Sequence, residues 1–197
     1  TFLATQNLGK TTLGEMASTI GQVAPTAEAL GVSFNDLAGA TAFLTSNGIN
    51  TASTMTGLKA AFSNIMKPTD DASKMAAQLG LDFSIAGLKS KGFSGFVNDL
   101  AEKLKDYEAD GGDATDATSK LFGSVEGLNV MLKLTGSGLD KYNDMNLKVA
   151  NSSGTLNKMA QDVTSTFSAQ KELIQNHLFA ALERVGEIIV ENIVPSA

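Results

Sequence analysis

The 197-residue chain contains no cysteine and no tryptophan, and its aromatic residues make up only 6% of it. Without cysteine, it has no disulfide framework and no thiolate chemistry. No run approaches the roughly 18 apolar residues that a membrane-spanning helix needs, so we expect no membrane contact by this segment. The 15 basic residues are outnumbered by 21 acidic residues, which gives a net charge of −6. That balance leaves no basic stripe for nucleic acid, and no specific nucleic-acid binding is predicted.

Signatures of catalysis are also missing from the sequence. The only histidine, His177, falls in a predicted helix, where a surface or boundary position is favoured over a catalytic role. No P-loop, nucleophile elbow, dinucleotide-binding fingerprint or His-Glu-x-x-His motif occurs. Asp110, Asp113 and Asp116 are three residues apart, which does not match the alternating ligands of a calcium loop and favours helix capping at Asp113. We predict no enzyme, no catalytic residue, no cofactor and no metal.

What the chain does have is helical periodicity, interrupted by many glycines and only three prolines. Thr12 and Glu15 fit a capping box, and Ser33 followed by Asp36 marks a second helix start. Two helices joined at 47–48 are predicted over 33–68, with Pro68 as the stop. The chain is predicted to be all-α, a multi-helix bundle of short helices with one long C-terminal amphipathic helix.

The second half of the chain divides at several glycine-rich breaks. The clearest break, at 110–113, predicts a division into a helical region 1–110 and a helical region 111–197. Before it, the segment 82–95 has the weakest pattern and fits a short strand or a loop, and a clear helix is predicted from Ser94. After it, a helix beginning near Ser124 is predicted to bury Val125, Leu128, Met131 and Leu132.

The longest periodic segment is predicted from about 155 to 194. Its mean spacing is near 3.6 residues, which favours a long packed helix over an extended coiled coil. At 1.5 Å per residue it would be roughly 55 to 60 Å long, which is more than a compact domain of this size needs. The excess length predicts that the helix either continues into a neighbouring segment or pairs with another copy of the chain. The predicted contact is its apolar stripe, through Phe167, Ile174, Leu178, Leu182, Val185 and Ile189.

One string of residues resembles a known family. It consists of LGVS at 30–33, DLA at 36–38, AFLT at 42–45, GI at 48–49, TGLK at 56–59 and KP at 67–68. In this order and spacing the string resembles the conserved region of phage tail tape measure proteins, above all those of lactococcal siphophages. The resemblance runs from about 11 to 81 and continues more weakly at 121–123 and after Phe167. The chain begins with Thr1, so we expect it to be a segment of a longer protein.

The resemblance implies a structural segment involved in tail assembly, tail length determination and genome ejection. It places the protein in the lumen of the virion tail, and in the host cytoplasm during assembly. The partners it implies are other copies of the chain, tail tube proteins, distal tail or baseplate proteins, and tail assembly chaperones. The many glycine caps favour a folded module over an extended rod.

Two alternatives remain open at this point. A stand-alone helical adaptor would bind a partner helix and have no part in tails. A cell-wall hydrolase accessory would need one glutamate with a raised pKa in a sugar-binding cleft. Glu15, Glu28, Glu102 and Glu126 all sit in ordinary helix-start or exposed positions, and the aromatics that line sugar clefts are absent.

Overall fold

The computed structural model describes residues 2–152, and every regular element among them is helical. The first half contains α1 (Phe2–Leu8), α2 (Leu13–Thr19), the 3-10 helix η1 (Ile20–Gln22), α3 (Ala24–Ala29), α4 (Phe34–Ser46) and α5 (Thr51–Met66). It is followed by α6 (Asp70–Leu79), α7 (Ile85–Ala109), α8 (Ala114–Leu121), α9 (Val125–Thr135) and a last helical stretch over 139–152. The predicted all-α fold is confirmed, while the predicted long C-terminal helix lies outside the described residues.

Local side-chain to backbone hydrogen bonds begin the helices where the sequence predicts them. The capping box before α2 is complete: the Glu15 amide donates to Thr12 Oγ1 at 3.2 Å, and the Thr12 amide donates to Glu15 Oε2 at 2.9 Å. The Asp36 amide donates to Ser33 Oγ at 3.0 Å at the start of α4. Each cap satisfies a backbone N–H that has no partner inside its helix, and both predictions are confirmed.

The start of α7 differs from the prediction. Helical structure begins at Ile85 because the Gly87 amide donates to Ser84 Oγ at 3.0 Å, and 81–84 form a loop and not a strand. The helix predicted from Ser94 is therefore only the second part of α7. Gly92, with φ 68° and ψ 169°, bends the chain between the two parts. That combination is accessible essentially to glycine alone, so the kink depends on this residue.

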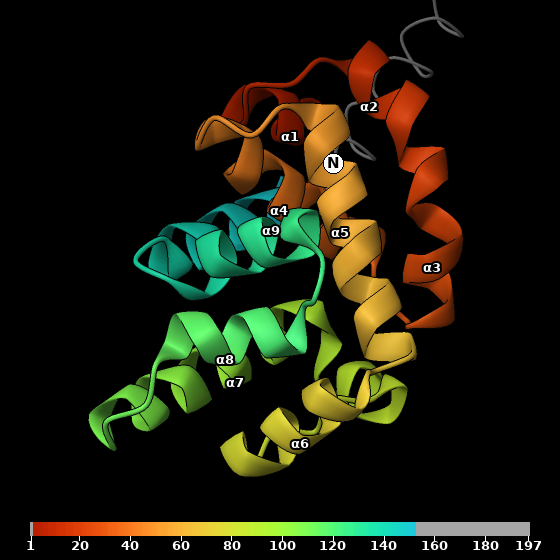
Figure 1. The fold of residues 1–197 in the computed structure, drawn as a ribbon. Helices are drawn as coiled ribbons and strands as arrows, with labels where there is room; N and C mark the ends of the chain where they lie inside the picture. The colour runs from red at the N-terminus through yellow and green to blue at the C-terminus, as the bar shows by residue number, and fades with distance from the viewer. Residues whose placement is uncertain (1, 153–197) are drawn as a thin grey trace, which may run out of the picture. The chain divides into compact units, whose positions relative to one another are not determined.

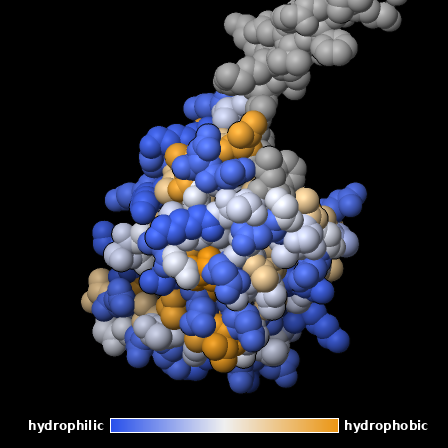
Figure 2. Space-filling view, turned by 90° about the horizontal axis from the view of Figure 1, so that it is seen from above, coloured by the Kyte–Doolittle hydropathy of each residue, from blue (hydrophilic) through white to orange (hydrophobic). Residues whose placement is uncertain are grey.

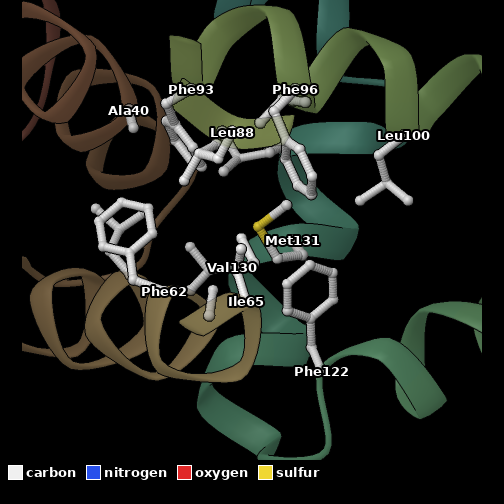
Figure 3. Packing of buried hydrophobic residues seen from close by; sticks show 14 of the residues in the cluster. Ala40, Phe62, Ile65, Leu88, Phe93, Phe96, Leu100, Phe122, Val130 and Met131 are labelled. Atoms are coloured by element: carbon white, nitrogen blue, oxygen red, sulfur yellow. The ribbon is translucent and has the colours of Figure 1, made fainter. Parts of the chain in front are cut away.

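The core lies where α4, α5, α7 and α9 meet, and Figure 3 shows side chains from these helices pointing toward one another. Phe62 and Phe93 pack edge to face with ring centroids 5.2 Å apart. Phe83 contacts Phe122 in the same way, at 5.4 Å. In Figure 1, α5 runs from top to bottom of the view and α9 crosses α5. The helices α6, α7 and α8 lie toward the bottom of the view. Among the helices α1 to α9, the most extensive contact is the one between α5 and α9.

The glycine-rich break at 110–113 forms a tight turn between α7 and α8, in which Gly111 has φ 90°. The described residues 2–152 belong to one compact unit. Side chains from both sides of the break, such as Phe83 and Phe122, share one core cluster. The division into regions 1–110 and 111–197 stays a prediction, since much of the second region lies outside the described residues.

The surface is largely polar. On the face drawn in Figure 2 most residues are hydrophilic, and apolar residues gather in patches, one of them near the lower edge of the view. Within 2–152, no helix combines the length and the apolar character that crossing a membrane requires.

Candidate functional site

The position of α9 is fixed by a close crossing with α5. A Cβ added at Gly57 would lie 2.1 Å from Val130 Cγ2 and 2.7 Å from the carbonyl oxygen of Glu126. A Cβ added at Gly127 would lie 3.3 Å from the backbone nitrogen of Ala61. These two glycines therefore let the helix backbones approach more closely than larger residues would allow.

This crossing decides which face of α9 turns inward. The buried residues of the helix are Gly127, Val130, Met131 and Leu134. The prediction that Val125 is buried is wrong, since its side chain is 69% exposed. Leu128 and Leu132, also predicted as core, are only half-buried, and Met131 alone of the four is fully buried. The reason is that Gly127 has to face α5, which rotates Val125 outward.

A hollow of about 890 Å³ lies beside the outward-turned side of α9. Its walls come from the end of α4, the start of α5, α9 and the turn at 136–138. Its apolar lining includes Phe43, Ile49 and Leu132. The turn packs closely against Phe43, because a Cβ added at Gly138 would lie 2.4 Å from Phe43 Cζ. The size is within the range of small-molecule and peptide-binding clefts.

The charged residues of the hollow are Glu126, Lys133 and Lys141. None of these three side chains forms an ion pair or a hydrogen bond with another residue in 2–152. Lys91, Lys120 and Lys148, by contrast, each pair with an aspartate. The hollow thus has more positive than negative charge, although the chain as a whole is acidic.

A buried polar cluster lies next to the hollow, between α4 and the 139–152 helix. The Tyr142 ring is fully buried and stands edge-on to Phe43, with ring centroids 6.0 Å apart. Burial, followed by the negative charge of Asp36, raises the pKa of the Tyr142 phenol above its usual range. Asn146 donates from Nδ2 to Asp36 Oδ1 at 3.3 Å. The cluster fixes the 139–152 helix on α4 and offers no nucleophile or proton donor to solvent.

The residues that the sequence singled out are distributed as follows. All six predicted interface residues, Phe167, Ile174, Leu178, Leu182, Val185 and Ile189, and His177 with them, lie outside the described part of the chain. Asp113 caps α8, its Oδ1 accepting from the Asp116 amide at 3.0 Å, so the capping interpretation is confirmed. Among residues 2–152, no group of three or more potential metal ligands is brought together.

Sequence reasoning missed the hollow. A signal was present in the composition of α9, whose eleven residues include only two charged ones. A helix with one buried side needs apolar residues on that side only, whereas the apolar residues of α9 occupy more than one face. The second apolar face was the signal that α9 also borders a hollow.

Comparison with known proteins decides the family. Residues 1–123 match the family described as phage-related minor tail protein. The chain belongs to this family. The match covers the predicted resemblance at 11–81 and all helices from α1 to α8.

A curated relative of this minor tail protein is the "Tape measure protein" of Pneumococcus phage Dp-1. The two are 27% identical over 187 residues, which is 93% of this chain and 15% of the relative. The chain therefore spans a small part of the length of the relative it matches. This similarity confirms the resemblance to tape measure proteins, and it extends over residues beyond 152. No solved structure matches the chain.

Membership of this family supports a structural role of the chain in the phage tail.

Proposed function

We propose that this segment is a folded module of a tape measure protein, which takes part in tail assembly, tail length determination and genome ejection. The observation that carries the proposal is the similarity to a tape measure protein along 93% of the chain. Its proposed location is the tail lumen, after assembly in the host cytoplasm. The family's structural role makes catalysis by this segment unexpected.

The physical basis of a molecular ruler is the fixed rise of helical chain, about 1.5 Å per residue. Drawn out as one helix, residues 2–152 would extend roughly 230 Å. Folded as described, they have an expected radius of gyration of about 15 Å. A folded module therefore adds little to the ruler, and we propose that it anchors the protein to its partners.

The proposed partners are other copies of the chain, tail tube proteins, distal tail or baseplate proteins and tail assembly chaperones. For contact between copies, the apolar stripe from Phe167 to Ile189 remains our proposal. If replacing both Leu178 and Val185 by Asp leaves oligomeric state and tail assembly unchanged, this contact does not exist.

The experiment that tests the proposal is an in-frame deletion of 2–152 in the parent gene, with tails measured by electron microscopy. A folded anchoring module predicts failed assembly, or tails shortened by much less than about 230 Å. Shortening by that full amount would show that the segment is extended in the tail. Tails of normal number, length and infectivity would remove the tail role and favour the adaptor alternative.

The mass of the parent polypeptide in purified particles is a second measurement. A parent several times longer than this chain would support a ruler, because 197 residues cannot span a tail. A parent close to 197 residues would contradict the ruler.

A further inference from the structure

The side of α9 that faces the hollow has an ordered arrangement of side chains. Val125, Glu126, Asn129, Leu132 and Lys133 line the hollow and recur at helical spacing. Val125 is 69% exposed, and Glu126, Asn129 and Lys133 are exposed as well. Buried Val130, which packs against Gly57 of α5, also lines the hollow, so this side borders the buried one. Within residues 2–152 nothing covers it.

The charges on this side have opposite signs at its two ends. Glu126 lies in the first turn of α9 and Lys133 in the last turn. Seven residues separate them, which corresponds to about 10 Å along the helix axis. Val125 and Leu132 are separated by the same interval, and Asn129 lies near the middle. Lys141, from the following helix, adds a second positive charge to the hollow.

A suitable occupant would be a helix with apolar residues two turns apart, a carboxylate opposite Lys133 and a cation opposite Glu126. In antiparallel orientation, α9 of another copy meets these requirements. We propose that the hollow side of α9 binds the same side of α9 in a second copy, with the two helices antiparallel about a two-fold axis near Asn129.

The proposed contact is self-complementary, as a two-fold interface has to be. Glu126 of each copy meets Lys133 of the other, so both charge pairs form at once. Val125 of each copy packs near Leu132 of the other, and the two Asn129 amides face each other at the axis. A parallel arrangement would instead place Glu126 on Glu126 and Lys133 on Lys133, where like charges repel. The Glu126–Lys133 pairs therefore favour the antiparallel over the parallel direction, while Lys141 of each copy has no acid of the hollow left to pair with.

The hollow gives the second helix a place to lie. Its volume of about 890 Å³ accommodates several side chains, and half-buried Ile49 belongs to its lining, with the fully buried Phe43 beneath. Since one three-turn helix and one wall make a small contact, we expect weak pairing, observable at high micromolar to millimolar concentration. The pairing concerns free copies in solution and does not rest on the proposed function, so either can fail alone.

The test is a charge-exchange cycle on the full 197-residue chain, measured by sedimentation equilibrium. Glu126→Lys and Lys133→Glu should each weaken pairing about ten-fold or more, because two attractive contacts become repulsive. The double variant E126K/K133E restores opposite charges at both places and should return pairing to near the original strength. Only a contact in which α9 meets its own copy predicts this recovery.

A second measurement uses the absence of cysteine from the chain. Asn129→Cys places one thiol at the proposed axis, where each Cys meets its counterpart, and mild oxidation should yield a covalent dimer. The matched control is Lys74→Cys on the exposed side of α6, which should cross-link only at the slow rate of random collision. Thermal unfolding of each variant verifies that it is folded.

The outcomes are decisive in either direction. A chain that stays monomeric at millimolar concentration would overturn the proposal. So would association that is unaffected by E126K and K133E, since it would use another surface, such as the 167–189 stripe. Equal cross-linking at positions 129 and 74 would overturn it too.

Discussion

Asn98 and Asn143 exchange two amide hydrogen bonds between α7 and the 139–152 helix. Asn98 Nδ2 donates to Asn143 Oδ1 at 3.0 Å, and Asn143 Nδ2 donates to Asn98 Oδ1 at 2.7 Å. The two residues are 45 positions apart in the chain and both are partly buried. This reciprocal pair holds the last described helix in one register against α7, because sliding either helix would break both bonds.

The first prediction concerns this amide pair. Replacing Asn143 by Leu removes both bonds between the two amides and leaves Asn98 only the bond that its Nδ2 donates to the Ser94 carbonyl at 2.8 Å. We expect the free energy of unfolding to fall by about 1 to 3 kcal/mol. The double variant N98L/N143L removes both polar groups and should lose less than the sum of the single losses. Urea unfolding followed by circular dichroism measures all four proteins. Strictly additive losses would show that the two amides do not interact.

The second prediction concerns the α5–α9 crossing. Gly57→Ala places a methyl group against Val130 and the Glu126 carbonyl, and we expect about 1 to 3 kcal/mol of destabilisation from overpacking. Adding Val130→Ala should recover only part of this loss, since the backbone carbonyl stays in place. Gly14→Ala is the matched control, because that helical glycine has nothing within 4 Å of the added Cβ. It should be neutral or stabilising by up to about 1 kcal/mol, and Gly57→Ala behaving like it would disprove the close crossing.

The third prediction compares two glycines with positive φ, Gly80 and Gly92, which differ in ψ. Gly92 and Gly80 both have open space at Cβ, so only backbone conformation opposes a substitution. Gly80 is left-handed, with φ 64° and ψ 32°, which asparagine tolerates. Gly92 has ψ 169°, where asparagine is no better than alanine. Gly92→Asn should therefore cost about 1 to 3 kcal/mol and Gly80→Asn clearly less, as measured by chemical unfolding. Equal costs would show that α7 is not kinked as described.

The fourth prediction is a pH dependence that arises from Tyr142. Its pKa is raised in the folded state, so the folded protein holds the phenol proton at a pH where the unfolded chain releases it. Stability from this group is complete below about pH 10 and is lost as the pH rises above that value. Urea unfolding at pH 9 and at higher pH should show this loss.

Tyr142→Phe is the control for that measurement. The buried Tyr142 hydroxyl forms no hydrogen bond of ordinary geometry with another residue in 2–152, and of the influences on its pKa, burial is the largest and Ser94, which lowers it, the smallest. Removing the hydroxyl should therefore leave stability at pH 7 unchanged or slightly higher. The alkaline loss should then be smaller than in the parent protein. A variant with the same alkaline loss would show that the effect does not arise from Tyr142.

Much of the fold could be predicted because helix starts are local. Ser33 and Asp36, or Thr12 and Glu15, are three residues apart, and one hydrogen bond between them decides where a helix begins. The same holds for Gly80, whose left-handed conformation ends α6. The family resemblance was visible for a related reason, since it lies in the order of short strings along the chain.

What failed was the start of α7 and the orientation of α9. The weak pattern at 82–95 did not reveal a helix from Ile85, because the kink at Gly92 interrupts its periodicity. For α9, both sides of the helix are apolar enough to be buried, and periodicity alone cannot choose between them.

The sequence by itself therefore determined that the chain is helical, where most helices begin, and that it resembles phage tail proteins. Only the tertiary structure decided which side of α9 is buried, because that depends on Gly57, a residue 70 positions from Gly127 in the chain. Local hydrogen bonds select helix ends within a few residues, whereas the choice of a buried face is made by the backbones that can approach most closely. That choice left Val125, Glu126, Asn129, Leu132 and Lys133 facing the hollow.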